Sequence, residues 1–235
     1  MTYLLSDIHG EYDLFCELLD KIDYSDDDTL YVLGDFLDKG NGSARLARLL
    51  CELPNVRAIL GNHEHYFLSV YEGLLKDLPQ GGDMETVLQK MQSLFPNDGK
   101  CLSWEVLDFI ENLPLYIETE SFICVHAGLR LDDDGEALPI AEQEPNFFLF
   151  DRRFADKSVM PKKGKTVFFG HTPCHYDNGD GSFIKTPREP NKAESNEYQD
   201  YIKIRLDNGV GYTKRLGCLR LEDMREFYVK KMENF

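Results

Sequence analysis

The sequence of 235 residues contains little of what marks membrane, secreted or disulfide-linked proteins. Its apolar runs are only a few residues long, far short of the roughly 20 that a membrane helix needs. None of its six cysteines belongs to a Cys-x-x-Cys pair, so we expect reduced thiols rather than a disulfide framework. No Lys or Arg precedes Lys21, and the charged start of a secretory signal is therefore missing. These absences predict a cytoplasmic protein.

Positive charge is also scarce, with 26 Lys and Arg against 42 Asp and Glu and a formal net charge of −16. Residues 191–235 carry nine basic and eight acidic side chains, so residues 1–190 carry the remaining −17. Nucleic-acid binding needs clustered Lys and Arg, and we therefore expect neither a nucleic-acid nor a membrane partner. An apolar content of 42% predicts a folded chain. The length fits a single domain over residues 1–235.

The first sixty residues alternate between strand and helix patterns. Apolar runs at 3–5, 29–33 and 56–60 predict strands, and helical spacing of apolar residues predicts helices over 12–22 and 43–51. Strands joined by helical crossovers imply right-handed connections and a mostly parallel sheet. In such sheets the ligand site lies beyond the carboxyl ends of the strands. That edge is where functional residues are expected.

The remainder of the chain divides into a helical part and a strand-rich part. Residues 63–113 have mainly helical patterns and predict a helical cap over about 66–113, beside the site. The polar stretch 176–200 predicts an exposed loop. Alternating segments near the end predict closing antiparallel strands, at 201–206, 210–213, 217–221 and 226–230.

Five predicted strands are each followed by a potential metal ligand beside a glycine, which permits a tight turn and a close backbone approach. The segments are 6–10 (SDIHG), 34–40 (GDFLDKG), 61–64 (GNHE), 126–128 (HAG) and 170–173 (GHTP). Four of the six histidines lie in them, which makes coincidence an implausible explanation. Asp, Asn and His donors without a thiolate suit Mn, Fe, Zn or Mg rather than a structural zinc.

These five motifs, in this order over residues 6–173, resemble those of the calcineurin-like metallophosphoesterases. Within that family they are most similar to the bacterial phosphoprotein phosphatase branch. The family series is Gly/Ser-Asp-x-His-Gly, Gly-Asp-x-x-Asp-Arg-Gly, Gly-Asn-His-Glu, His-Ala-Gly and Gly-His-Thr. The resemblance implies an α/β fold in which central mixed β-sheets form a sandwich flanked by helices, with a helical cap.

The resemblance also implies two divalent metal ions and assigns their ligands. Asp7 and His9 would hold the first ion, and Asp35 would bridge the two. The second ion would be completed by Asn62, His126 and His171. We expect Mn²⁺, and Fe, Zn and Mg are compatible with the same donors.

By the same resemblance, His63 is the general acid and Asp38 orients it. A hydroxide held between two metal ions would attack phosphorus directly, so no phosphoenzyme is required. His63 would then protonate the leaving oxygen. These two residues are the predicted catalytic side chains.

Substrate binding requires cationic or polar donors near the metals. Lys39 stands where the family has an arginine, and a lysine supplies charge without the planar two-pronged fork. Arg152 matches a second family arginine better than its neighbour Arg153, for which a structural ion pair is equally open. Asn62 is expected to contact substrate as well as metal.

Four further residues near the motifs are expected to have no direct chemical role. His65 and His175 match no ligand position, and we expect them to lie on the surface or to support their neighbours. Glu64 is expected to orient its neighbours, and Tyr212 to lie outside the site.

Three functions remain open, and the first is favoured because Asp38 and Glu64 are typical of its branch. It is a binuclear-metal phosphatase for phosphomonoesters, acting on phosphoserine or phosphothreonine in proteins or on a small phosphoester. The alternative is a dinucleoside-polyphosphate hydrolase such as a diadenosine tetraphosphate hydrolase, a sister group that typically lacks the aspartate at position 38. A non-catalytic binding protein is the third, and only Lys39 favours it.

Overall fold

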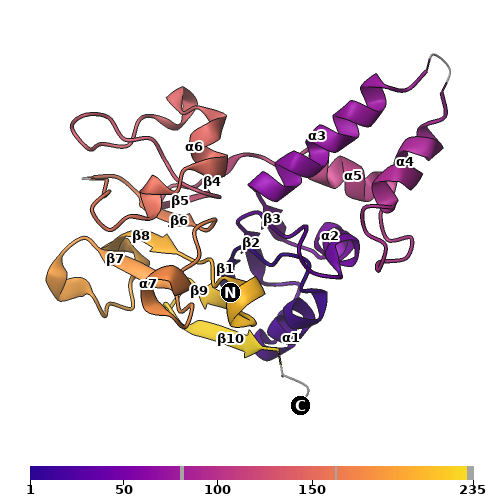
Figure 1. Ribbon diagram of the computed structural model, residues 1–235. Coiled ribbons are helices and arrows are strands. Elements are labelled where there is room, and N and C mark those ends of the chain that lie inside the picture. The colour runs from indigo at the N-terminus through magenta and orange to yellow at the C-terminus, as the bar shows by residue number, and fades with distance from the viewer. Residues whose placement is uncertain (80–81, 162, 232–235) are drawn as a thin grey trace.

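Two five-stranded mixed sheets form the centre of the molecule, which a computed structural model describes over residues 1–79, 82–161 and 163–231 (Figure 1). The first sheet has the order β10-β9-β1-β2-β3 and the second β4-β5-β6-β8-β7. The strands of the two sheets are β1 (Thr2–Leu5), β2 (Thr29–Val32), β3 (Val56–Ala58), β4 (Tyr116–Glu118), β5 (Phe122–Val125), β6 (Thr166–Phe169), β7 (Ile184–Pro187), β8 (Tyr201–Arg205), β9 (Arg215–Arg220) and β10 (Glu226–Lys230).

Helices cover the outer faces of these sheets and fill the connections between strands. They are α1 (Tyr12–Ile22), α2 (Ser43–Glu52), α3 (Asn62–Lys76), α4 (Met84–Gln92), α5 (Trp104–Glu111), α6 (Pro145–Phe150), α7 (His175–Asn178) and α8 (Val210–Thr213). The predicted fold class, mixed sheets flanked by helices, is confirmed.

Three strands of each sheet pair in parallel with one another. In the first sheet β1, β2 and β3 are parallel, as the alternation of strands and helices predicted. In the second sheet β5, β6 and β8 are parallel. All six strands therefore send the loops that follow them toward carboxyl-terminal sheet edges, where α/β proteins place ligand sites.

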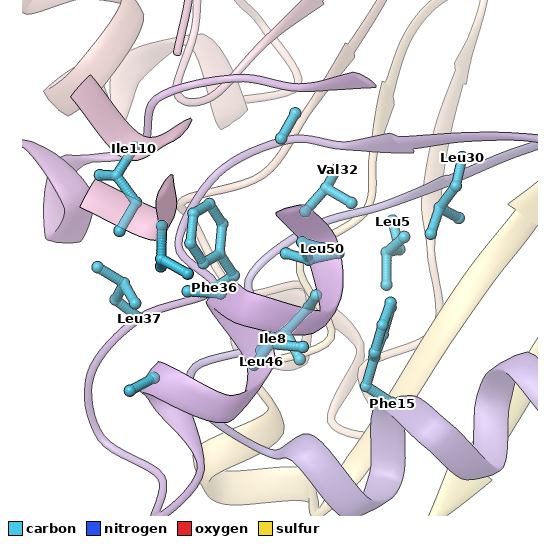
Figure 2. Close-up of a cluster of buried hydrophobic side chains, with 14 of the residues drawn as sticks. Leu5, Ile8, Phe15, Leu30, Val32, Phe36, Leu37, Leu46, Leu50 and Ile110 are labelled. Atoms are coloured by element: carbon cyan, nitrogen blue, oxygen red, sulfur yellow. The ribbon is translucent and has the colours of Figure 1, made fainter. Parts of the chain in front are cut away.

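The side chains of each strand alternate between two cores, as the two-residue period of a strand requires. Leu4 of β1 and Phe168 of β6 lie in the apolar layer between the two sheets. Leu5 faces the opposite way, toward Phe15 of α1 and Leu46 of α2 (Figure 2). The loops that carry the site are thus anchored on strands packed on both faces.

The C-terminal part differs from the sequence-based expectation in two elements. Residues 201–206 were predicted as an antiparallel closing strand, and β8 is antiparallel to β7 on one side but parallel to β6 on the other. Residues 210–213 were predicted as a strand, but they form the helical turn α8 after Gly209, whose φ is 68°. A segment of four residues is too short for periodicity to separate helix from strand, and pairing direction depends on distant partners.

The stretch 176–200, predicted as an exposed loop, contains most of α7, the strand β7 and two 3-10 turns, Pro190–Lys192 and Tyr198–Asp200. β7 pairs with β8 in antiparallel fashion and forms the edge of the second sheet. All four side chains of β7 are half-buried, so the strand lacks the alternation of apolar and polar residues that would have predicted it.

The helices α3, α4 and α5 lie where the sequence predicted a helical cap, and α3 and α4 extend away from the sheets (Figure 1). The division into one domain with a cap over 66–113 stays a prediction. Among the described residues, no helix is both long enough and apolar enough to cross a bilayer.

Candidate metal centre

The predicted ligands come together at the carboxyl ends of the central strands. Asp7 follows β1, Asp35 follows β2 and Asn62 begins α3 directly after β3. From the second sheet, His126 follows β5 and His171 follows β6. A cavity of about 180 Å³ opens here, and eight of the predicted site residues line it: Asp7, His9, Asp35, Lys39, Asn62, His63, Arg152 and His171.

The backbone of these loops is strained at the predicted site residues. Six non-glycine residues of the loops adopt left-handed φ angles between 48° and 68°: Asp7, His9, Asp35, Asp38, Lys39 and His171. Such conformations cost roughly 1–3 kcal/mol each and persist only where the surrounding structure enforces them. Their concentration at one sheet edge marks a functional site rather than an ordinary set of turns.

Glycines beside the ligands allow the loops to touch each other. A Cβ on Gly170 would lie 2.0 Å from Ser6 Oγ and 2.2 Å from Asp7 Oδ2, so no side chain fits there. The same closeness lets the His171 backbone N–H donate to Asp7 Oδ2 at 3.0 Å. The glycine that accompanies each motif is therefore explained by direct packing of one loop against another.

The side-chain atoms that could hold a metal ion form two groups that share Asp35. His9, Asp35 and His63 offer atoms within 4.8 Å of one another, and so do Asp35, His126 and His171. His9 Nε2 lies 3.8 Å from both Asp7 Oδ1 and Asp35 Oδ2. A carboxylate common to two clusters is the arrangement expected of a ligand that bridges two cations.

The histidines are oriented by backbone carbonyls so that one nitrogen of each faces inward. The Leu33 carbonyl accepts from His126 Nδ1 at 2.8 Å, and His126 Nε2 lies 3.0 Å from Asn62 Oδ1. The Leu37 carbonyl accepts from His9 Nδ1 at 3.3 Å. Because a carbonyl can only accept, the proton sits on Nδ1 and the Nε2 lone pair remains for a cation.

The electrostatics of the cluster favour a bound cation. Burial raises the pKa of Asp7 and of Asp35 above the ordinary range, and the proximity of Asp35 adds to the rise for Asp7. Burial lowers the pKa of His126 to about 4 and that of His171 to about 3, so both imidazoles are neutral near pH 7. Neutral imidazoles with crowded carboxyl groups fit divalent metal ions, whose charge relieves the repulsion.

His63 has the geometry of an oriented acid. Its Nδ1 lies 3.0 Å from Asp38 Oδ2, and its Nε2 points inward, 3.7 Å from Asp35 Oδ2. Burial lowers the pKa of His63, while the Asp38 carboxylate opposes that effect. The imidazole is thus placed to carry a proton at Nε2 toward the cavity.

Glu64 ties two of the loops together. Its carboxylate accepts from the backbone N–H groups of Asp35, Leu37 and Gly61, at 2.7, 2.8 and 3.0 Å. The side chain is fully buried and does not line the cavity. Its place is therefore to fix the loop that carries Asp35.

Two cationic side chains face the cavity, Lys39 and Arg152. Lys39 Nζ lies 2.8 Å from His9 Nε2, so the lysine must move when that nitrogen binds a cation. Arg153 instead pairs with Asp151 at 2.9 Å on the surface. The structure thus separates the neighbouring arginines into one at the cavity and one in an ion pair.

The model of the calcineurin-like phosphoesterase family matches residues 2–202. The chain belongs to this family. Membership implies divalent metal ions, and the two clusters around Asp35 supply suitable donors.

Individual relatives of this phosphoesterase are named for their activity on dinucleotides. The symmetrical bis(5'-nucleosyl)-tetraphosphatase of Aggregatibacter actinomycetemcomitans is 32% identical over 147 residues, which cover 61% of this chain and 50% of that protein. The enzyme of the same name from Salmonella paratyphi C (strain RKS4594) is 34% identical over 132 residues, covering 54% and 43%. This chain therefore spans about half the length of the curated relatives it matches.

A solved structure agrees with the fold over nearly the whole phosphoesterase. It is described provisionally as a diadenosine tetraphosphatase, with a TM-score of 0.67 and 21% identity, covering 99% of this chain and 94% of that one. At this identity the likeness concerns the fold alone.

The expectation of a serine/threonine protein phosphatase was wrong, because the curated relatives are tetraphosphatases. That expectation depended on Asp38 and Glu64. In the structure Asp38 contacts His63 and Glu64 binds backbone N–H groups, so both support the centre itself. Neither side chain therefore identifies the substrate.

Sequence reasoning missed several residues of the cavity wall, three of them with polar side chains. Asp207, Tyr176 and Tyr212 line it, although Tyr212 was expected outside the site. Asp207 is buried, and burial together with Asp7 raises its pKa well above the ordinary range. It follows the end of β8, so the strand-end rule would have found it had β8 been recognised as a parallel strand.

Proposed function

We propose that this phosphoesterase hydrolyses dinucleoside polyphosphates, with a diadenosine tetraphosphate as the test substrate. The observation that carries the proposal is similarity to tetraphosphatases combined with two ligand clusters joined at Asp35. Together they pair a substrate class with a centre able to act on a phosphoanhydride.

The proposed metal ligands are the six residues assigned by resemblance. Asp7, His9 and Asp35 would hold one ion, and Asp35 would share the second with the remaining three: Asn62, His126 and His171. When bound, divalent cations supply Lewis-acid polarisation of phosphoryl oxygens and acidify water near neutral pH. We propose Mn²⁺ as the activating ion, because oxygen and imidazole donors without thiolate suit it.

The chain's own residues bind the polyphosphate and manage the proton. Lys39 and Arg152 face the cavity and neutralise phosphate oxygens, Lys39 as a point charge and Arg152 as a planar fork. His63 holds a proton at Nε2 and passes it to the leaving oxygen, while Asp38 fixes the ring through Nδ1. The leaving group therefore departs on the His63 side of the cavity.

The decisive assay uses chelator-treated protein with diadenosine tetraphosphate, and Mn²⁺ is then restored. We expect no hydrolysis in chelator and, with Mn²⁺, conversion to ADP, the product of symmetrical cleavage. A phosphoserine peptide and p-nitrophenyl phosphate are the comparison substrates. Turnover in chelator, or no cleavage of the dinucleotide beside rapid cleavage of either comparison substrate, would contradict the proposal.

A further inference from the structure

A second cavity of about 240 Å³ shares His63 with the metal centre. We call it the α3 groove, and it is lined mainly by His63, Tyr66, Phe67, Val70, Leu94 and Phe95. Neither cavity alone reaches the roughly 300 Å³ at which small-molecule sites begin. Because His63 belongs to both walls, one elongated ligand can occupy the two together.

The α3 groove exposes apolar side chains to solvent at its rim. Tyr66 is 57% exposed, Leu94 48% and Val70 46%. The base of the groove is well packed, because the rings of Phe67 and Phe95 lie with their centroids 5.6 Å apart. Grouped apolar exposure beside a polar centre marks a surface that a ligand covers.

Tyr66 is held in place from outside the groove. Its ring centroid lies 5.9 Å from that of Phe150 in α6 and 6.2 Å from that of His65. Packing from this side restrains the tyrosine, and a large part of the ring remains accessible. A restrained aromatic face is the kind of surface on which a planar ring stacks.

Charge divides the two cavities between different parts of a ligand. Lys39 and Arg152 line the metal centre, whereas the described residues contribute only Asp38 and its partner His63, and no Lys or Arg, to the groove. A phosphate deep in the groove would therefore meet neither a lysine nor an arginine. The groove therefore suits a neutral ring, and the metal centre suits phosphate.

The length of the groove fits a nucleotide rather than a small alcohol. His63 and Val70 lie seven residues apart on α3, which at 1.5 Å per residue separates the two ends by roughly 10 Å. The leaving oxygen starts at His63, because that residue supplies its proton. In ADP, the leaving group of symmetrical cleavage, two phosphates follow that oxygen at the mouth of the metal centre, so the part that reaches the far end of the groove is the ribose and its base.

We propose that the α3 groove binds the base of the leaving nucleotide, which stacks on Tyr66 and contacts Leu94. This assignment rests on the proposed function and adds the residues that select a nucleotide over a plain polyphosphate. Stacking of one base on an aromatic side chain corresponds to roughly a tenfold contribution or more. The groove thus acts as a specificity site beside the metal centre.

The test compares kcat/KM for diadenosine tetraphosphate and inorganic tripolyphosphate with Mn²⁺ present, and the readout is the ratio of the two. We expect Tyr66→Ala to lower this ratio about tenfold and Tyr66→Phe to restore it, because phenylalanine keeps the stacking face. Leu94→Ala tests the opposite wall and lowers the ratio severalfold. Met84→Ala is the matched control, since Met84 is exposed at the start of α4, outside the groove. An equal fall on both substrates in Tyr66→Ala would overturn the proposal.

A binding arm separates this proposal from the proposed function. Saturation-transfer NMR with adenosine needs no hydrolysis, so it reports on the groove even if the dinucleotide is not a substrate. Transfer from wild-type protein to the adenine protons, reduced at least severalfold in Tyr66→Ala and retained in Tyr66→Phe, supports the groove as a base site. Transfer that is absent in the wild type, or unchanged in Tyr66→Ala, overturns it. Failure to cleave the dinucleotide overturns the proposed function alone.

Discussion

Two of the places where the molecule buries charged side chains differ in how those charges are compensated. Lys203 on β8 is 2% exposed, and its Nζ donates to three backbone carbonyls. The acceptors belong to Phe154, Asp156 and Val159, at 2.7, 2.6 and 2.5 Å. All three donors of the ammonium group therefore have partners within the protein.

Asp7 and Asp35 are just as buried, but each has fewer partners: Ser6 Oγ and the His171 backbone N–H donate to Asp7, and the His63 backbone N–H donates to Asp35. Within the described residues, neither carboxylate pairs with a Lys or Arg, and the histidines beside them are shifted toward the neutral form. An isolated buried charge is costly, so such a cluster is stable in its charged form only with a cation. The comparison teaches that Lys203 stabilises the fold, whereas the two carboxylates are suited to binding a cation.

Asp35→Asn is expected to have the largest effect, and it tests whether this buried carboxylate serves catalysis rather than stability. Asp35 belongs to both ligand clusters, so we expect hydrolysis to fall on the order of a thousandfold. In chelator the variant should be at least as stable as the wild type, because one of two repelling carboxylates is gone while the amide oxygen can still accept from the His63 N–H. Kinetics and thermal unfolding in chelator measure the two effects. A clear fall of Tm in chelator would show that Asp35 serves the fold.

Lys203→Met should show the reverse behaviour. It leaves three buried carbonyls without a donor, and we expect the free energy of unfolding to fall by about 3 kcal/mol. Activity per folded molecule should stay near that of the wild type. Urea unfolding measures the change, with Lys157→Met as an exposed control in a nearby loop. Equal stability of the two variants would refute the structural role of Lys203.

His63→Asn separates proton transfer from metal binding. We expect kcat to fall about a hundredfold, since general acid catalysis contributes at least that much. Metal content should remain unchanged, because the ring nitrogen Nδ1 is engaged by Asp38 and the resemblance gives His63 no ligand role. Elemental analysis of the purified variant decides the point. Loss of metal would make His63 a ligand.

The pH dependence of stability gives the smallest effect. Burial lowers the pKa of Lys203 to about 8, against about 10.4 in an unfolded chain. Between these values the unfolded state binds the extra proton, so the contribution of Lys203 to stability rises with pH, by roughly 1 kcal/mol from pH 8 to 9. Lys203→Met lacks this rise. Urea unfolding of both proteins at the two pH values measures it, and parallel curves would contradict the lowered pKa.

That the proposed ligands lie close together could be predicted, because parallel strands converge at one edge and bring the donor after each strand end to the same place. For Asp7, Asp35 and His126 the local sequence alone shows a donor directly after a predicted strand. The contact between Tyr66 and Phe150 could not be predicted in this way, since it joins α3 and α6, which are far apart in the chain.

The missed residues have a common physical origin. Asp207 follows β8, whose parallel pairing with β6 is set by a partner some thirty-five residues away. Tyr212 lies in a four-residue helical turn that begins after the left-handed Gly209. Substrate class was misjudged because Asp38 and Glu64 contact the centre's own residues rather than the substrate.

Titration of chelator-stripped protein with Mn²⁺ by calorimetry tests the central claim most directly, that the buried carboxylates and imidazoles hold two cations. We predict two Mn²⁺ per chain, a rise of Tm on binding, and loss of both ions in Asp35→Asn. Absence of binding, or binding that Asp35→Asn leaves unchanged, would contradict it.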